Sequence, residues 1–302
     1  VMLELKNPKI AVPVVLFAGL VWSFGPLVVR YMDSPAQVPW QYIFGRGLTI
    51  FILLNLYLYF EEGIKFWKNY LKVGRSGVIG GSALGIAMIS FIFSITNTSA
   101  AITLLCLAAM PFFTALLAFI FLKEQISLNV WISIAIATIG IFIMAFGNTG
   151  ENSLVGLIFG ITSSVGFSVF SVTLRWRKET PKFTTVAFAG LFCFVFSTIM
   201  ILFKGQVFFS TSYNSSLFSL HGTLVCIGLI LYSIGSKAIP AAELTLLSLT
   251  EVIGGIFWVW LPLFGINEVP DTNTIIGGFF LFISLFYYSL VMRWNKRYIG
   301  LN

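Results

Sequence analysis

Long apolar runs separated by short polar connections extend along the whole chain. Each run has about 20 residues, the length that crosses a bilayer as an α-helix. The runs are continuously apolar and do not alternate with polar residues, so they indicate helices and not the strands of a membrane β-barrel. We expect an all-α polytopic membrane protein with ten spans, at residues 11–32, 40–60, 76–95, 98–122, 130–147, 154–174, 184–203, 219–237, 240–263 and 273–292.

The composition supports a membrane protein and excludes several soluble classes. Of the 302 residues, 58% are hydrophobic and 10% are charged, whereas a soluble domain carries about 25% charged residues. This excludes a soluble enzyme, a disordered chain and a secreted disulfide scaffold. The three cysteines lie inside apolar runs and match no metal motif, so we expect no metal and no other cofactor. The first apolar run is long enough to span, so no cleavable signal peptide is expected.

Lysine and arginine residues gather in every second connection between the predicted helices. Fifteen of the 18 lie at the two termini and in the second, fourth, sixth and eighth connections, whereas only Lys204 lies on the opposite side. The remaining two, Arg30 and Arg46, lie within predicted spans. Because cytoplasmic connections are enriched in Lys and Arg, both termini are predicted to be cytoplasmic. The net charge of +7 follows from this topology, and no nucleic-acid partner is expected.

The two halves of the chain, residues 1–148 and 149–302, carry traces of an internal repeat. A shift of 141 residues aligns identical small residues, namely Gly19 with Gly160, Ser23 with Ser164 and Gly25 with Gly166. Each half contains five predicted helices, and an odd number means that the second half enters the membrane from the opposite side. Such inverted repeats are typical of secondary transporters, whose substrate site lies between the halves near the midplane.

The first half also carries a set of family motifs. They are Trp22-Ser-Phe-Gly25, Arg46 in the second predicted helix, Thr98-Ser-Ala-Ala101, Pro111, and Leu122-Lys-Glu124. With these motifs the chain resembles the ten-helix EamA-type members of the drug/metabolite transporter superfamily. The resemblance implies that the first, third, fourth, sixth, eighth and ninth helices surround a central cavity, and it does not specify a substrate. The second half departs from the pattern, because it has Glu251 near the position that would match Pro111.

Charged residues inside predicted spans are the strongest candidates for function, because each costs roughly 2.5–3.5 kcal/mol at the bilayer centre. Arg46 lies two turns into the second predicted helix, where it can bind an anionic group or tie helices together. Glu251 lies near the middle of the ninth, where it can recognise an amine, carry a coupling proton, or form a structural pair with Arg46. Arg30 and Glu243 lie near helix ends and can reach water.

Small and aromatic residues supply the remaining candidates for a substrate site. Ser23 lies on one face of the first predicted helix, and Ser164 is its counterpart in the repeat. Trp22, Tyr232 and Trp258 can form an aromatic wall, which together with one carboxylate suits a cationic or zwitterionic amine. The alternative for all of these residues is ordinary helix packing.

These features predict a secondary transporter that moves a small organic metabolite by alternating access. An amino-acid-like amine or zwitterion is favoured, with Glu251 as a possible proton-coupling group. The alternatives are a carrier of organic anions recognised by Arg46, and an exchanger or facilitator without coupling. A channel would need rings of charges along a pore, and an enzyme would need clustered catalytic residues; neither pattern occurs in the sequence. The expected partners are the small solute and the lipid bilayer, in a bacterial inner membrane.

Overall fold

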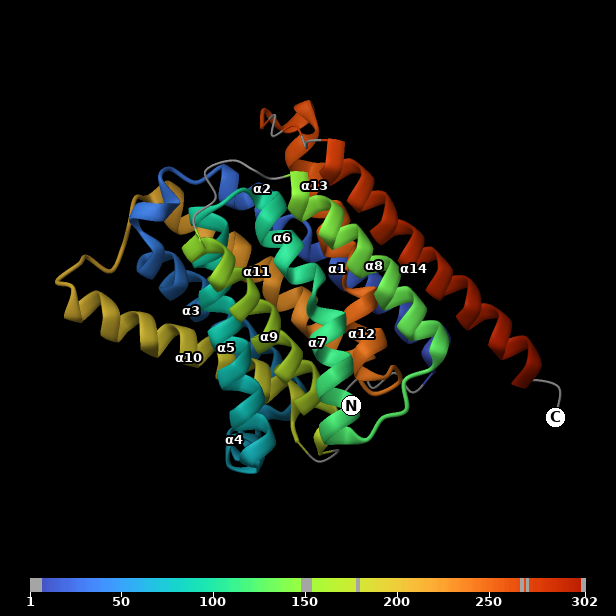
Figure 1. Ribbon diagram of the computed structural model, residues 1–302. Coiled ribbons are helices and arrows are strands. Elements are labelled where there is room, and N and C mark those ends of the chain that lie inside the picture. The colour runs from blue at the N-terminus through green and yellow to red at the C-terminus, as the bar shows by residue number, and fades with distance from the viewer. Residues whose placement is uncertain (1–6, 148–153, 178–179, 267–268, 270–271, 300–302) are drawn as a thin grey trace.

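The computed structural model describes residues 7–147, 154–177, 180–266, 269 and 272–299, and every regular element in these ranges is helical (Figure 1). The α-helices are α1 (Pro8–Trp22), α2 (Gly25–Arg30), α3 (Pro39–Glu62), α4 (Trp67–Lys72), α5 (Gly74–Asn97), α6 (Ala100–Ala108), α7 (Met110–Leu117), α8 (Leu128–Gly147), α9 (Leu154–Trp176), α10 (Lys182–Phe203), α11 (Ser212–Gly235), α12 (Ala241–Leu247), α13 (Thr250–Trp260) and α14 (Thr272–Ile299). A π-helical turn, Ala118–Leu122, continues α7. The predicted all-α class is therefore confirmed. The predicted boundary between the halves, at residues 148 and 149, lies outside the described residues.

Eight helical stretches in the described part of the chain are long and apolar enough to cross a membrane. They are Pro8–Arg30, Pro39–Lys72, Gly74–Asn97, Ala100–Leu122, Val155–Trp176, Lys182–Phe203, Ser212–Gly235 and Ala241–Trp260. Two shorter apolar stretches, Leu128–Ile143 and Ile275–Tyr288, lie within α8 and α14. Each of the ten predicted ranges thus contains helix.

Three of the predicted spans are interrupted, although the apolar pattern there is continuous. The first breaks between α1 and α2, and the fourth breaks at Ala109, between α6 and α7. A proline lies in the first turn after each of these breaks, Pro26 in α2 and Pro111 in α7. Proline lacks a backbone N–H, and it is tolerated there because the first N–H groups of a helix have no partner within the helix.

The ninth predicted span breaks without a proline. Helix α12 ends at Leu247 and α13 begins at Thr250, with Ser248 and Leu249 between them. The Ser248 hydroxyl donates a hydrogen bond of 2.8 Å to the carbonyl of Thr245. A hydroxyl that bonds to the preceding turn offers the backbone an alternative to the helical pattern. Glu251 consequently lies in the first turn of α13 and not in the middle of one long helix.

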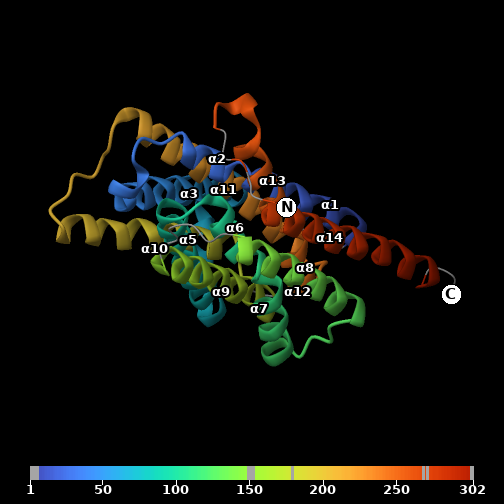
Figure 2. The ribbon, with the colours of Figure 1, turned by 45° about the horizontal axis from the view of Figure 1, so that its top comes forward.

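Every long helix of the first half packs against a helix of the second half. The described contacts pair α1 with α11, α3 with α10, α5 with α9 and α8 with α14, while α6 packs against α13 and α7 against α12. Figures 1 and 2 show α8 and α14 side by side at one edge of the bundle and α3 and α10 at the opposite edge. The halves therefore interlock along their whole length.

Helices α3 and α10 approach each other so closely that glycine is required at their contact. A Cβ added to Gly190 would lie 2.9 Å from the backbone nitrogen of Phe51, and one added to Gly47 would lie 2.8 Å from the Cβ of Cys193. Small residues at such contacts let two backbones come together, and in a membrane this packing is a principal source of helix association.

We expect Gly190→Val to force α3 and α10 apart and to destabilise the protein by about 1–3 kcal/mol, because overpacking displaces backbone. The measurement is thermal unfolding in detergent, where the melting temperature should fall by several degrees. Gly278→Val is the matched control, since a Cβ at Gly278 in α14 meets no neighbouring atom. Equal melting temperatures for the two variants would contradict the close contact.

Candidate functional site

A cavity of about 60 Å³ lies inside the bundle, among helices from both halves of the chain. Its walls are mostly aliphatic and aromatic, and its polar lining residues besides Trp22 are Arg46, Ser163, His221 and Glu251. Its volume is below the ~300–1,000 Å³ of pockets that enclose drug-sized ligands. In this conformation the cavity has room for a few water molecules or for part of a compact solute.

The cavity lies where the three interrupted helices break. Trp22 is the last residue of α1, Leu107 and Met110 flank the break between α6 and α7, and Glu251 lies one residue after the start of α13. Irregular backbone at membrane depth is tolerated only where it is buried in protein or lines a cavity. The irregular backbone at the three breaks therefore contributes to the wall of the cavity.

Arg46 reaches the cavity from α3 and is 5% exposed. Its guanidinium carbon lies 5.4 Å from the centre of the Phe91 ring, a cation–π contact. Within the described part of the chain, its Nε and Nη1 atoms have no hydrogen-bond partner. A buried guanidinium normally has its donors paired, so Arg46 combines a position at the cavity with two buried donors that lack a partner.

Glu251 faces the same cavity from α13. Its charge and that of Arg46 are close enough to interact, yet the two side chains form no salt bridge among the described residues. The carboxylate lies in the first turn of α13, where the helix dipole favours a negative charge. The structural pair with Arg46, one of the three roles open to Glu251 from the sequence, is thus not formed in this conformation.

His221 is a cavity residue that the sequence reasoning did not select. It lies on α11, is 2% exposed, and forms a hydrogen bond between its Nδ1 atom and the hydroxyl of Tyr42. Its ring meets the Phe91 ring edge to face, with 6.1 Å between the centres. The sequence could have indicated His221 as a cavity residue. It lies seven residues before Gly228 and eleven before Tyr232, a spacing that places all three on one helix face.

Of the predicted aromatic wall, only Trp22 lines the cavity directly. Its Nε1 atom donates a 3.2 Å hydrogen bond to the carbonyl of Val225, which fixes the indole. Tyr232 is fully buried behind it, with 5.5 Å between the ring centres, and its hydroxyl shares a 2.7 Å hydrogen bond with Ser171. Tyr232 therefore supports the wall that Trp22 forms.

Ser23 and Trp258 lie beside the cavity lining and join the break after α1 to α13. The Trp258 Nε1 atom donates a 2.8 Å hydrogen bond to the Ser23 hydroxyl oxygen, and Ser23 donates a 2.6 Å bond to the carbonyl of Leu20. The Trp258 ring stacks on Phe24, with 4.7 Å between centres. These contacts hold the interrupted part of α1–α2 against the helix that carries Glu251.

The predicted Ser164 is fully buried next to the cavity, and its neighbour Ser163 is the residue that lines it. Ser163 donates a 2.8 Å hydrogen bond to the carbonyl of Ala87. The Ser164 hydroxyl has no hydrogen-bond partner among the described residues. A shift of one residue along a helix turns a side chain by about 100°, so Ser163 lines the cavity while Ser164, the counterpart of Ser23 in the repeat, is buried beside it.

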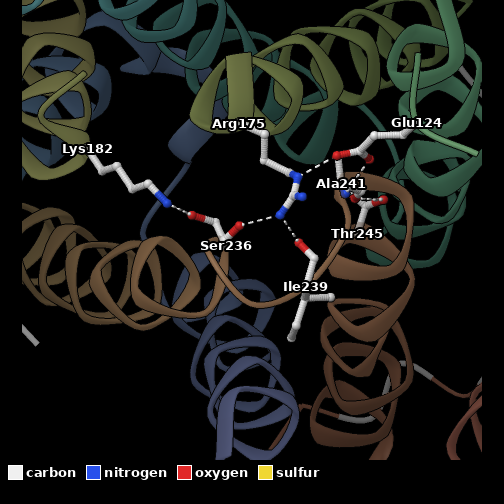
Figure 3. A network of polar contacts seen from close by, with 7 residues as sticks. All are labelled: Glu124, Arg175, Lys182, Ser236, Ile239, Ala241 and Thr245. Atoms are coloured by element: carbon white, nitrogen blue, oxygen red, sulfur yellow. Dashed lines mark hydrogen bonds and ion pairs between the residues drawn. The ribbon is translucent and has the colours of Figure 1, made fainter. Parts of the chain in front are cut away.

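A polar network joins three connections at one end of the bundle (Figure 3). The Arg175 Nε atom lies 2.5 Å from Oε1 of Glu124 in an ion pair, and its Nη1 atom donates to the carbonyls of Ser236, at 3.0 Å, and Ile239, at 2.8 Å. Oε2 of Glu124 in turn accepts a 3.2 Å bond from the backbone nitrogen of Ala241, at the start of α12. One arginine and one carboxylate thus hold together the ends of four predicted spans, the fourth, sixth, eighth and ninth.

Lys182 extends this network to α10, because its Nζ atom donates a 2.5 Å hydrogen bond to the Ser236 hydroxyl (Figure 3). All of these residues lie at ends of helices that the charge distribution predicts to face the cytoplasm. These bonds therefore join the helix ends of both halves, and the network shares no residue with the cavity lining.

Comparison with known proteins finds a family match for the first half of the chain. Residues 9–146 match the EamA-like transporter family. An uncharacterized transporter of Helicobacter pylori strain J99 is 27% identical over 164 residues, which are 53% of this chain and 52% of that protein. The match therefore spans about half the length of that relative. An uncharacterized transporter of strain 26695 is 25% identical over 252 residues, 80% of each chain.

A protein of known crystal structure has the same fold. It superposes with a TM-score of 0.72 at 18% sequence identity, over 94% of this chain and 98% of that one. The family match covers the motifs from Trp22 to Glu124, including Arg46 of the cavity. The resemblance inferred from the sequence is confirmed for residues 9–146, the part of this membrane protein that matches the EamA-like transporter family.

Proposed function

We propose that this protein is a secondary transporter that moves a small amino-acid-like solute, an amine or zwitterion, across the membrane by alternating access. One observation carries the proposal. Arg46 and Glu251 face one cavity from different halves of the chain without forming a salt bridge. A zwitterion supplies the missing partner of each, with its carboxylate at Arg46 and its ammonium group at Glu251.

The energetics favour such a ligand. An uncompensated charge inside a membrane protein is costly, and the cost falls when a counter-charge and hydrogen bonds arrive together. A carboxylate can accept a hydrogen bond from a donor of Arg46 that lacks a partner within the protein. An organic anion without an amine can accept the same bond, and it is the second candidate substrate class. The aromatic rings of Trp22 and Phe91 supply apolar and cation–π contacts around either ligand.

The pairing of helices supports two inverted five-helix repeats, residues 1–148 and 149–302, with ten spans. An exchange of halves relates the α1–α11 contact to the α9–α5 contact. It also maps α3–α10 and α8–α14 onto themselves. The breaks in the fourth and ninth spans are related in the same way. A pseudo-two-fold axis of this kind gives a carrier two related conformations that open to opposite sides.

The network around Arg175 supports alternating access, because it accounts for closure at one end. Its ion pair with Glu124 joins the end of the fourth predicted span to the end of the sixth, and the Arg175 bonds to the next connection add the eighth and ninth. Opening that end requires these bonds to separate. In our proposal the cavity then becomes accessible from the cytoplasm.

Proton coupling through Glu251 extends the proposal. A carboxylate at a cavity that faces the two sides in turn can release a proton on one side and take one up on the other. Substrate amine and proton then compete for the same oxygen atoms. Exchange or facilitated transport without a proton is the alternative, and it needs Glu251 only for binding.

The proposed location is a bacterial inner membrane with both termini in the cytoplasm. Fifteen of 18 basic residues lie in the connections assigned to that side. Large apolar side chains are exposed on the outside of the bundle, among them Phe60, Leu202 and Phe279, as expected where a protein meets lipid.

Transport into liposomes tests the proposed function. We expect the purified protein to exchange at least one L-amino acid across the membrane without ATP. Arg46→Ala should weaken binding of that acid about 10–100-fold, the effect of losing hydrogen bonds to a charged group. Binding of the C-terminal amide of the same amino acid, which lacks the carboxylate, should weaken much less. The affinity of Arg46→Lys for the acid should lie between those of the wild type and Arg46→Ala. Arg75→Ala, which removes an exposed arginine, is the control. Equal losses for acid and amide would refute carboxylate recognition by Arg46.

Glu251→Gln tests the role of the carboxylate. The variant keeps the side-chain shape, and Glu251 has no hydrogen-bonding or ion-pair partner among the described residues, so the melting temperature should change little. Transport driven by a pH gradient should be lost, whereas substrate counterflow persists if only proton coupling is affected. Glu243→Gln is a matched control on the other part of the broken helix, where the carboxylate accepts a bond from Tyr288. Wild-type transport and pH dependence in Glu251→Gln would return this residue to a packing role.

Single-cysteine labelling tests the topology. In a background that lacks Cys106, Cys193 and Cys226, new cysteines at Lys65 and Val207 occupy exposed positions in the second and seventh connections. An impermeant thiol reagent should label the cysteine at position 207 in intact cells and the one at position 65 only after the membrane is opened. Labelling of both from the same side contradicts the predicted orientation.

A further inference from the structure

We propose that His221 supplies a second donor, its Nε2–H group, to the anionic group of the substrate, so that Arg46 and His221 bind one carboxylate together. The inference rests on the proposed function and names the geometry of its anion subsite. His221 lines the cavity that Arg46 and Glu251 face. The proposed function rests on Arg46 and Glu251 alone, so a failure of His221 as a donor leaves it intact.

The two donors are neighbours because α11 packs directly on α3. A Cβ added to Gly222, the residue after His221, would lie 2.9 Å from the backbone carbonyl oxygen of Arg46. Both side chains also contact the same ring, since Phe91 lies 5.4 Å from the guanidinium carbon and 6.1 Å from the imidazole centre. The guanidinium and the imidazole thus lie against one aromatic surface at the cavity.

The hydrogen bond to Tyr42 determines which imidazole nitrogen carries the proton. Tyr42 is fully buried, and its described hydrogen-bond partner is Nδ1 of His221. A buried phenol needs an acceptor for its hydrogen, so Tyr42 donates and Nδ1 accepts. The proton of the neutral ring is then on Nε2. Tyr42 itself is held by stacking on Phe218, with 4.9 Å between ring centres and 20° between planes.

The Nε2 edge needs space, which Gly25 provides. A Cβ at Gly25 would lie 2.8 Å from the His221 Nε2 atom and would cover it. Gly25 is the last residue of the Trp22-Ser-Phe-Gly25 motif and begins α2 directly after the break. The motif therefore leaves this edge of the imidazole free of side chain at the point where the backbone is irregular.

These observations combine into a two-point anion subsite. Arg46 offers unpartnered N–H groups with a positive charge, and His221 offers a neutral N–H group with a fixed tautomer. Two donors from neighbouring helices suit the two oxygens of a carboxylate better than a single-point contact does. The substrate class that follows is a carboxylate-bearing amine, with Glu251 left for the amine.

The tautomer can be observed directly because His221 is the only histidine of the chain. A tag-free protein labelled with ¹⁵N in histidine gives the imidazole signals of one residue, and His221→Gln is the blank. We expect a neutral ring with the proton on Nε2 in the wild type and a mixture of tautomers in Tyr42→Phe. Tyr232→Phe, which alters another buried tyrosine that lies behind the cavity wall, should leave the signal unchanged. A proton on Nδ1 in the wild type overturns the proposal.

Ligand binding tests the second donor. The probe is the tightest-binding of the twenty proteinogenic L-amino acids, compared with its C-terminal amide. His221→Leu should weaken binding of the acid about 10–100-fold and binding of the amide less than about threefold. His221→Gln, which keeps an N–H donor, should recover part of the loss. The acid should also shift the Nε2 resonance, and the amide should not.

The outcomes separate the two levels of the argument. A wild-type protein that binds none of the amino acids refutes the proposed substrate class, and the His221 subsite is refuted with it. A wild-type protein that binds the acid, together with a folded His221→Leu variant that loses acid and amide equally, refutes only the role of His221. Loss for the acid with partial recovery in His221→Gln supports both.

Discussion

The proposed function depends on two side chains of opposite charge that face one cavity without forming a salt bridge. Opposite charges attract each other strongly in a low-dielectric interior. Arg46 and Glu251 are carried by different halves of the chain, and the halves pack against each other along α3–α10 and α5–α9. The contact of the guanidinium with Phe91 compensates part of its charge. A ligand that pairs with both Arg46 and Glu251 would form the two ionic contacts that the protein alone does not make.

The sequence was sufficient for the helices, because a bilayer requires long apolar segments and leaves few alternatives. It was insufficient where polar residues continue a helix. Helix α11 begins at Ser212, seven residues before the predicted start, in a segment rich in serine and asparagine. Thr211 caps it by accepting a 3.2 Å bond from the Asn214 backbone. The break at Ser248 was likewise not predicted, since no proline marks it and a serine within an apolar run does not by itself indicate a helix end.

The site shows the same division between local and tertiary information. Arg46 and Glu251 were identifiable because a charge inside an apolar run is costly wherever it points. Helical periodicity placed Tyr232 on the face of α11 that also carries His221. It did not show that Trp22 lies between Tyr232 and the cavity. His221 lies on the same face, and its imidazole is hydrogen-bonded by Tyr42 on another helix, 179 residues away in sequence. Only the folded chain brings such partners together.

The cavity and the closed end are mechanically linked, because the same helices serve both. Helix α9 carries Phe167 at the cavity and Arg175, eight residues later, in the network. Helix α12 begins at Ala241, whose backbone nitrogen donates to Glu124, and α13 of the same span reaches the cavity at Glu251. A ligand that draws Glu251 and Arg46 together acts on the short segment α12, which lies between the two sites. Binding can then shift the balance between closed and open forms only through a difference in contacts between them. In the proposed transport cycle the charges of Arg46 and Glu251 supply that difference, because a bound zwitterion would pair with both.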